Sequence, residues 1–481
     1  MNVLAIDQGT SSTKALVVGE DGRILATAEA PVHPVALPDG GVEQDPEELW
    51  ASVLASGRRV LRDAGVPVST IGFSNQGETV LAWDRASGEP RSVALSWQDR
   101  RATDVCDRLA GQAASLEAIT GLPLDPYFAA PKMARIRERL TREGVVTTSD
   151  VWLVHRLTGA FVTDAATASR TLLLDLDRTA WSEAALAAFG LADEPLPAVI
   201  PCAGVVGETE AFGGRLPVAG LAVDQQAALF AEACHAAGEA KCTFGTGAFL
   251  LANTGDSPHR STSGLAACVA WRLGDVTSYC LDGQVYTAGA AVTWLQEVGL
   301  IAAPTDLDRL GGSVAETDGA TFVPGLAGLA APFWRPHARG AFVGLSLATS
   351  RAHLVRAVIE GLAAGVACLA EAAAQDLGRP LTRLRVDGGL TRSVTLMQVT
   401  ADLLQAVVEV YPSPNATALG VAALARIGVG DLEGGTAVAR DWRPVATYEP
   451  RITADEADER LARWQAAAAA TMELGGGASH A

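Results

Sequence analysis

Residues 3–18, with the sequence VLAIDQGTSSTKALVV, decide the fold. Apolar residues lead into Asp7, a turn of glycine and hydroxyl residues follows, and a second apolar run leaves the turn. This pattern predicts two strands joined by a tight turn. Gly9 lets the turn close without a Cβ clash. The hydroxyl and backbone N–H groups of residues 10–12 converge on a small volume that suits phosphate oxygens, and Asp7 could hold a hydrated Mg²⁺ ion.

An ordinary polar hairpin would show the same pattern, so the recurrence of the turn matters more than the turn itself. Residues 241–251, KCTFGTGAFLL, repeat the layout of strand, Gly-Thr-Gly turn and apolar strand about half a chain later. A further strand at 384–386 ends in Asp387-Gly388-Gly389. Two similar turns so far apart indicate a duplicated domain with a nucleotide between the copies.

The composition excludes several kinds of partner. The net charge of −18 argues against nucleic acid and against an anionic membrane surface. Seven scattered cysteines without a Cys-x-x-Cys pair are typical of reduced thiols in a cytoplasmic protein. We expect no signal peptide and no membrane helix, because the chain enters a strand at once and no apolar run reaches about 18 residues.

The 481 residues are enough for two domains. Asp45 and Pro46 predict the start of a helix that Gly65 ends. A second, alanine-rich helix is expected to open at Asp224 and run to about residue 237. We therefore predict an N-terminal domain at 1–232 for substrate and phosphate, a C-terminal domain at 233–481 for adenosine, and a disordered tail at 474–481.

Neither a Walker phosphate loop nor a Gly-x-Gly-x-x-Gly fingerprint occurs, so phosphate binding must depend on the two hairpin turns. Paired hairpins with a Gly-Gly turn resemble the actin-like fold. The expected fold class is therefore α/β, with two actin-like (ribonuclease H-like) domains and an interdomain nucleotide cleft. That fold serves sugar kinases, chaperone ATPases and filament proteins, so the function must come from the site.

Eight segments resemble, in order, the motifs of glycerol kinases. They are AIDQGTSS (5–12), FSNQGET (73–79), WQDRR (97–101), AVDQQAAL (222–229), TFGTG (243–247), APFW through ARG (331–340), RVDGG (385–389) and ATALG (416–420). The match covers nearly the whole chain, and the protein is identified as a member of the FGGY carbohydrate kinase family.

The resemblance implies transfer of the γ-phosphate of ATP to a hydroxyl of a small polyol or sugar, with Mg²⁺ as the metal. Asp224 would be the catalytic base, although an Asp at a helix start could also be an N-cap. Asp7 would organise the metal. The ATP-binding residues would be Thr10, Ser11, Ser12, Lys14, Gly245, Thr246, Gly319, Gly388, Gly389 and Gly420, any of whose glycines could instead be a turn residue. The substrate-binding residues would be Gly77, Glu78, Tyr127, Asp224, Gln225 and Tyr286.

The substrate side departs from the family pattern. Glycerol kinases have Arg where this chain has Gly77, and loss of a charged hydrogen bond costs roughly 1.5–3 kcal/mol. Tyr286 stands where glycerol kinases have Phe. We therefore expect a polyol or sugar larger than glycerol, in the tetritol to pentose range, unless another arginine such as Arg100 or Arg101 replaces the missing one.

Two other functions remain open at this stage. A ketopentose kinase such as xylulokinase would usually have Gln-Met-His-Gly at residues 75–78, where this chain has Asn-Gln-Gly-Glu. An actin-like ATPase would hydrolyse ATP without a sugar. Residues 213–217 faintly resemble a loop that binds a sugar-bisphosphate inhibitor, but they lack its Thr and are interpreted as an ordinary loop. The apolar helices would allow a homodimer.

Overall fold

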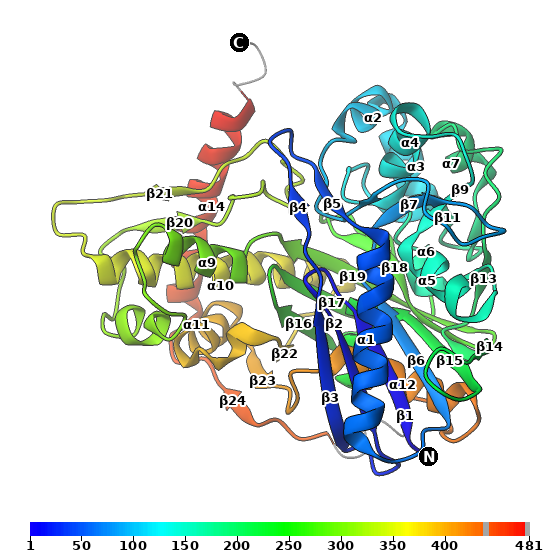
Figure 1. The fold of residues 1–481 in the computed structure, drawn as a ribbon. Coiled ribbons are helices and arrows are strands. Elements are labelled where there is room, and N and C mark those ends of the chain that lie inside the picture. The colour runs from blue at the N-terminus through cyan, green and yellow to red at the C-terminus, as the bar shows by residue number, and fades with distance from the viewer. Residues whose placement is uncertain (436–441, 477–481) are drawn as a thin grey trace.

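The computed structural model describes residues 1–435 and 442–476 (Figure 1). One sheet of 13 strands runs through both halves of the molecule in the order β24-β23-β22-β16-β17-β19-β18-β14-β15-β6-β1-β2-β3. Its N-terminal strands are β1 (Val3–Gln8), β2 (Ser12–Val18), β3 (Ile24–Pro31), β6 (Thr70–Asn75), β14 (Ala203–Thr209) and β15 (Leu216–Val223). Its C-terminal strands are β16 (Ala240–Phe244), β17 (Ala248–Gly255), β18 (Ala266–Leu273), β19 (Val276–Val285), β22 (Arg383–Asp387), β23 (Val407–Val410) and β24 (Ala446–Tyr448).

The sheet confirms the predicted duplication. In the N-terminal half the order β3-β2-β1-β6-β15 has β1 antiparallel to β2, β2 antiparallel to β3, and β1, β6 and β15 parallel. In the C-terminal half the order β19-β17-β16-β22-β23 repeats the same directions. The two predicted hairpins are β1–β2 and β16–β17, the first two strands of each copy.

The copies join where β14, paired with β15, meets β18 at Ala203 and Leu273. A second, five-stranded sheet covers one side of the N-terminal half in the order β4 (Val35–Ala36), β5 (Val42–Gln44), β8 (Ala94–Leu95), β7 (Val80–Trp83) and β9 (Val145–Thr148). Three small two-stranded sheets are β10 (Val162–Asp164) with β13 (Ala198–Ile200), β11 (Leu174–Asp175) with β12 (Ala180–Trp181), and β20 (Thr321–Val323) with β21 (Ala341–Val343).

Helix α1 (Pro46–Ala64) begins and ends as predicted. The Asp45 side chain accepts from the Glu47 N–H, and Gly65 adopts φ 61°. The expected alanine-rich helix is shorter than predicted, because α8 (Asp224–Ala231) is closed by a turn in which Ala233 has φ 59°. The other helices are α2 (Thr103–Arg108), α3 (Ala113–Thr120), α4 (Ala129–Arg139), α5 (Ser149–Thr158), α6 (Ala165–Ala168), α7 (Glu183–Ala188), α9 (Gly289–Glu297), α10 (Arg351–Leu377), α11 (Val394–Leu404), α12 (Ala416–Gly428) and α14 (Ala454–Gly476), with short turns η1 (Ala110–Gln112), η2 (Leu307–Gly311) and η3 (Gly389–Arg392).

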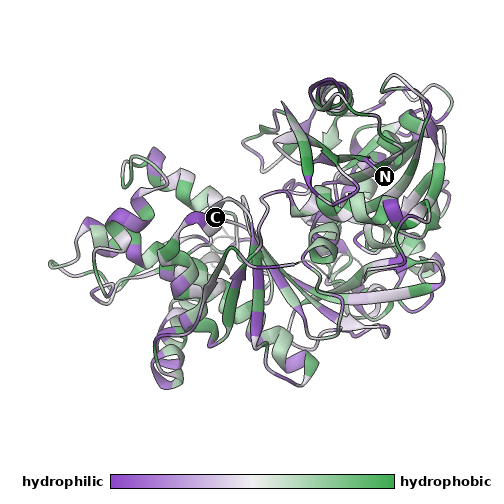
Figure 2. Cartoon of the chain, turned by 90° about the horizontal axis from the view of Figure 1, so that it is seen from below, coloured by the Kyte–Doolittle hydropathy of each residue, from purple (hydrophilic) through white to green (hydrophobic). Residues whose placement is uncertain are grey.

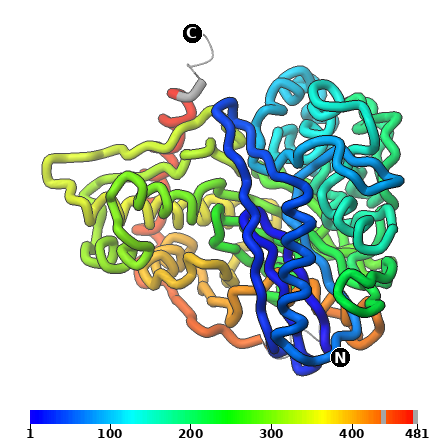
Figure 3. Tube along the Cα trace, viewed as in Figure 1, coloured from blue at the N-terminus to red at the C-terminus, as the bar shows by residue number. Residues whose placement is uncertain are grey.

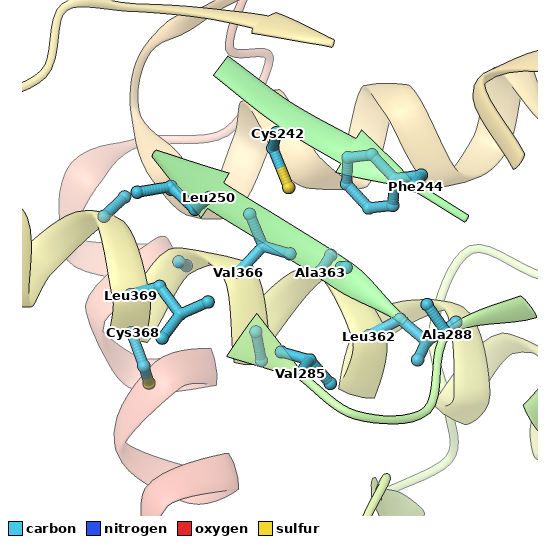
Figure 4. Packing of buried hydrophobic residues seen from close by; sticks show 14 of the residues in the cluster. Cys242, Phe244, Leu250, Val285, Ala288, Leu362, Ala363, Val366, Cys368 and Leu369 are labelled. Carbon is cyan, nitrogen blue, oxygen red and sulfur yellow. The ribbon is translucent and has the colours of Figure 1, made fainter. Parts of the chain in front are cut away.

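Helix α10 is long and apolar enough to cross a membrane by length and composition, but 83% of its most apolar window is buried inside the protein. Its residues Ala363, Val366 and Leu369 pack against Cys242 of β16 and Leu250 of β17 (Figure 4). In Figure 2 hydrophobic residues are frequent along the strands and their covering helices, and hydrophilic residues are frequent on the outer helices. Helix α10 is therefore a core helix of the C-terminal half.

Helix α12 belongs to the C-terminal half by sequence but packs on the N-terminal strands (Figure 3). A Cβ atom on Gly72 of β6 would lie 2.3 Å from the Val421 carbonyl oxygen, and one on Gly220 of β15 would lie 2.4 Å from the Ala425 nitrogen. The two glycines thus let this helix lie directly on the sheet. The domain division at 232/233 stays a prediction. Helix α12 follows this division in the sequence but packs on the strands that precede it.

Helix α14 continues to Gly476, so residues 474–476 are helical where a disordered tail was expected. Residues 477–481, the rest of that predicted tail, lie outside the described residues. Of residues 213–217, the first three lie in the hairpin turn between β14 and β15 and the last two begin β15, and the exposed Arg215 pairs with Glu208. This supports the interpretation of these residues as an ordinary loop.

Candidate active site

Both predicted turns line one cavity of about 140 Å³. The cavity brings together eight of the residues proposed from the sequence, namely Thr10, Gly77, Glu78, Tyr127, Asp224, Gln225, Gly245 and Thr246. Residues up to 236 positions apart meet here because the parallel strands β1, β6 and β15 end side by side, and the turn after β16 lines the same cavity. Trp97, Thr243 and Phe249 complete the lining and had no assigned role.

Asp224 is the first residue of α8, and its N-cap is Val223. One Asp224 carboxylate oxygen accepts from the adjacent Gln225 N–H at 2.7 Å, and no side-chain cap of the helix is made. Burial raises the pKa of Asp224 to about 7, Asp7 adds to the rise, and Lys241 opposes it. The N-cap alternative is thus unsupported, and a carboxylate with a pKa near neutrality suits a general base.

Asp7 faces Lys14 across the first hairpin. Burial raises the pKa of Asp7 to about 6, against the lowering effect of Lys14. Its Oδ1 is buried without a hydrogen-bond partner among the described residues, and such an orphaned carboxylate oxygen fits a cation. No cluster of three or more His, Cys, Asp or Glu residues suits a metal in the described ranges. The orphaned oxygen of Asp7 fits Mg²⁺ held through one carboxylate, waters and phosphates.

Lys241 supports the cavity from beneath, a role that sequence analysis missed. Its ammonium is fully buried and donates to Gln225 Oε1 at 2.6 Å and to Thr243 Oγ1 at 2.7 Å. The first contact fixes the Gln225 amide so that its oxygen is occupied, and its amide N–H group is a hydrogen-bond donor that lowers the pKa of Asp224. Gln225 is therefore set to donate a hydrogen bond into the cavity.

The first turn is braced by Trp97. Its indole N–H donates to Thr10 Oγ1 at 2.9 Å, and its ring lies 5.9 Å from both Tyr127 and Phe249 in edge-on geometry. Because Thr10 Oγ1 accepts this bond, its own proton remains available to a ligand. Of the other predicted phosphate residues, Ser11 is exposed and Ser12 and Lys14 are partly exposed, and none of the three lines the cavity.

The glycines proposed for adenosine separate into different roles. Gly389 has open space around its missing side chain, whereas a Cβ on Gly388 (φ 95°) would lie 2.4 Å from the Phe244 carbonyl oxygen. A Cβ on Gly420 would lie 1.9 Å from the Ala227 oxygen, so this glycine lets α12 pack on α8. Gly319 precedes β20 and lies beside Gly344, which follows β21, and neither glycine lines the cavity.

Gly289 supports the second turn and was also missed. Its N–H donates to the Gly245 carbonyl, and a Cβ there would lie 2.6 Å from that oxygen. The first turn of α9 is thereby seated on the Gly-Thr-Gly turn. The only sign of this role in the sequence is a glycine three residues after Tyr286. A glycine at that position is also common at an ordinary helix start.

Tyr286 lies at a second cavity, of about 630 Å³, and not at the first. The Arg100 guanidinium stands 4.2 Å above its ring, and Arg100 also pairs with Asp125 at 2.8 Å. Trp97 lines both cavities. Tyr286 thus lines the larger cavity together with Arg100, and its role in binding substrate stays a prediction.

Arg170 is the cation that contacts Glu78, the carboxylate predicted to bind substrate. Its Nε donates to Glu78 Oε1 at 2.6 Å. The expected substitutes were Arg100 and Arg101, but Arg100 pairs with Asp125, and Arg101 pairs with Asp99 and Glu43. Gly77 contributes only backbone to the cavity wall. A Cβ atom at this position would lie 3.0 Å from Val223 Cγ2, so a larger residue would need a shift of that side chain.

Comparison with known proteins agrees with this geometry. Residues 2–231 and 240–429 match the N-terminal and C-terminal domains of the FGGY family of carbohydrate kinases. A glycerol kinase of Aromatoleum aromaticum is 41% identical with 97% of each chain covered, and one of Methylibium petroleiphilum is 42% identical with 98% of this chain and 99% of that chain covered.

Solved structures lead to the same family. The glycerol kinase of Plasmodium falciparum with ADP has a TM-score of 0.89 and 31% identity over 98% of each chain. A xylulose kinase from Rhodospirillum rubrum has a TM-score of 0.86 and 25% identity over 99% of this chain and 100% of that chain. The chain belongs to the FGGY family of carbohydrate kinases, and its reaction is the ATP-dependent phosphorylation of a polyol or sugar.

Proposed function

We propose that the acceptor is a polyol larger than glycerol, in the tetritol to pentose range. The observation that carries this proposal is Gly77, which lines the cavity with backbone alone where glycerol kinases present an arginine side chain. The larger cavity that shares Trp97 offers further room for a longer acceptor. The Glu78 carboxylate would accept a hydrogen bond from one hydroxyl of the acceptor, and the Gln225 amide would donate a hydrogen bond to another.

In this proposal Asp224 is the general base. The proton of the reacting hydroxyl moves to the Asp224 carboxylate while the oxygen attacks the γ-phosphorus, and ADP leaves with the electron pair of the broken bond. A pKa of about 7 leaves much of Asp224 ionised at neutral pH. The buried walls from Trp97 and Phe249 would exclude water and so limit hydrolysis of ATP.

The phosphates would lie between the two turns, where Thr10, Gly245 and Thr246 already converge. Lys14, opposite Asp7, would add a positive charge, and Gly389 would leave space for adenosine. Asp7 would hold Mg²⁺, and a bound Mg²⁺ would neutralise charge on the β- and γ-phosphates.

Glycerol is the second candidate, and Arg170 favours it. This arginine supplies a cation at Glu78 from a different part of the chain, and the glycerol kinases that resemble the chain cover almost all of it. A ketopentose acceptor is supported less well, because the xylulose kinase compared above is more distant in sequence.

The test is ADP release from Mg-ATP with glycerol, erythritol, the pentitols, xylulose and ribulose as acceptors. We expect erythritol or a pentitol to have the highest kcat/KM. Glycerol as the best acceptor would replace the first candidate with the second. Release of ADP at the same rate without any acceptor would contradict both.

Two further parts of the proposal concern the protein as a whole. All seven cysteines are free and buried, which supports a cytoplasmic location. The homodimer stays a prediction, to be measured by light scattering with sedimentation.

A further inference from the structure

Arg170 stands between two carboxylates that belong to different halves of the molecule. Its Nε donates to Glu78 Oε1 at 2.6 Å, and its Nη1 lies 2.5 Å from Asp282 Oδ2. Glu78 follows β6 in the N-terminal half, and Asp282 lies in β19 of the C-terminal half. The three side chains are only 3–5% exposed, so the contacts are made away from solvent.

The backbone around Arg170 is firmly held. Its N–H donates to the Thr167 carbonyl, at the end of the short helix α6 that Asp164 caps. The neighbouring Ser169 hydroxyl accepts from the Val269 N–H of β18 at 3.0 Å. Arg170 therefore reaches Glu78 from a fixed base.

Glu78 itself is in a conformation that needs support. It has φ 56°, in the left-handed region that few residues other than glycine adopt. Its carboxylate lines the cavity and is buried. A buried carboxylate is costly unless a cation or hydrogen-bond donors face it, and Arg170 is that cation.

The guanidinium also meets the aromatic wall of the site. Its Cζ lies 5.6 Å from the Tyr127 ring and 5.3 Å from the Phe128 ring. Lys132, fully buried, holds this segment by donating to the carbonyls of Pro126, Tyr127 and Phe128. Arg170 thus contacts two walls of the substrate cavity at once.

We propose that Arg170 is a positioning residue for substrate binding, which orients the Glu78 carboxylate and ties it to the C-terminal half through Asp282. This inference rests on the proposed function, in which Glu78 accepts a hydrogen bond from an acceptor hydroxyl. Arg170 touches Glu78 and not the reacting atoms. Its removal should therefore weaken acceptor binding more than it affects ATP.

The experiment compares the full-length chain with Arg170→Gln, Arg170→Lys and Asp282→Asn, with glycerol and erythritol as acceptors. We expect Arg170→Gln to raise the acceptor KM by about tenfold to a hundredfold, the equivalent of one charged hydrogen bond. The KM for ATP should stay within about twofold. The acceptor KM of Arg170→Lys should lie between those of the wild type and Arg170→Gln, because an ammonium cannot reproduce the planar guanidinium that meets both carboxylates.

A double-mutant cycle separates positioning from general support of the fold. In a Glu78→Ala background, Arg170→Gln should raise the acceptor KM no further. Additive effects, or equal changes in both KM values together with a lower melting temperature, would overturn the proposal. If Arg170→Gln does not fold, Arg170→Lys and Asp282→Asn still test the proposal. An acceptor KM that is unchanged in both of these variants would overturn it.

The matched control is Arg137→Gln. Arg137 is a partly buried arginine of the same half. It pairs with Glu194 and with the backbone carbonyls of residues 141, 143 and 144, none of which lines either cavity. Its replacement should leave the acceptor KM unchanged. If the wild-type chain phosphorylates no acceptor, the proposed function is refuted instead. Calorimetry would then test Arg170 separately, by comparing the affinity of the wild type and of Arg170→Gln for erythritol. An equal affinity would overturn the role of Arg170.

Discussion

Lys241 and Gln225 are joined by a hydrogen bond of 2.6 Å from the lysine ammonium to the amide oxygen. The bond connects β16, the first strand of the second copy, to α8, which begins with the proposed base. Lys241 also opposes the rise in the pKa of Asp224 and of Asp387. It is therefore the shared cation beneath a group of buried carboxylates.

Replacement of Lys241 by Met should lower both stability and acceptor affinity. Removing one member of a buried ionic group costs about 3–5 kcal/mol, and Gln225 loses its anchor. Chemical denaturation and the acceptor KM would measure the two effects. Lys241→Arg keeps the charge and should retain more of the stability, and a Met variant as stable as the wild type would contradict the assigned role.

Asp224→Asn should still bind ATP and acceptor but lose nearly all turnover. A general base contributes typically a factor of 10²–10⁴ to the rate, and Asn cannot take the proton. Single-turnover ADP release would give the rate, and calorimetry would give the acceptor affinity. Retention of wild-type turnover would remove Asp224 from the role of base.

Gly77→Arg combined with Val223→Ala should shift preference toward glycerol. The second change is needed because a Cβ at position 77 would lie 3.0 Å from Val223 Cγ2. A charged hydrogen bond to a hydroxyl is equivalent to roughly 1.5–3 kcal/mol, so we expect the ratio of kcat/KM for glycerol to that for erythritol to rise at least about tenfold. Val223→Ala alone is the control, and an unchanged ratio would refute the specificity role of Gly77.

Glu232→Gln should stabilise the protein increasingly as pH rises. Burial raises the pKa of Glu232 well above 4.5, Asp387 adds to the rise, and Lys241 and Arg385 oppose it. The folded state then keeps a proton that the unfolded chain releases, so the free energy of unfolding of the wild type falls as pH increases above about 4.5. Gln removes this linkage.

Denaturant unfolding of the apo-protein in EDTA from pH 4 to 8 would measure the difference between Glu232→Gln and the wild type. The two curves should meet near pH 4 and separate above it. Glu20→Gln, at an exposed position, should run parallel to the wild type. Parallel curves for Glu232→Gln as well would mean that the folded carboxyl ionises normally.

Gly420→Ala should destabilise the protein and leave the KM for ATP unchanged. The added Cβ would lie 1.9 Å from the Ala227 oxygen of α8, and overpacking of this kind costs typically 1–3 kcal/mol. Gly428→Ala, on the same helix, would meet the Ala219 oxygen at 2.1 Å and should lose similar stability. A raised KM for ATP at full stability would instead support the predicted adenosine contact.

Much of the fold could be predicted because its signals are local. The hairpins at residues 3–18 and 240–255, and the start of α1 at Pro46, depend on alternation, turn glycines and a capping Asp within a few residues of one another. The two similar turns also predicted the duplication that the sheet order confirms. For the same reason eight proposed residues lie around one cavity, since seven of them closely follow the end of a strand or lie in the first turn of α8, and Tyr127 lies in the loop before α4.

The scarcity of lysine is a further signal in the composition. The chain has only three lysines against its many arginines, and each of them lies next to a proposed site residue: Lys14 opposite Asp7, Lys132 in contact with the Tyr127 carbonyl, and Lys241 in contact with the Gln225 amide. The three donors of an ammonium are tetrahedral, and those of Lys132 meet three carbonyls, which the planar guanidinium cannot do.

The sequence by itself determined the duplicated strands, the two turns proposed for phosphate and the position of the proposed base, because these depend on neighbouring residues. Only the tertiary structure decided which charges face one another. Arg170, Glu78 and Asp282 are distant in sequence, and no local pattern pairs them. Burial, which determines both the strength of such pairs and the pKa of Asp224, depends on how the two halves pack and so exists only in the folded chain.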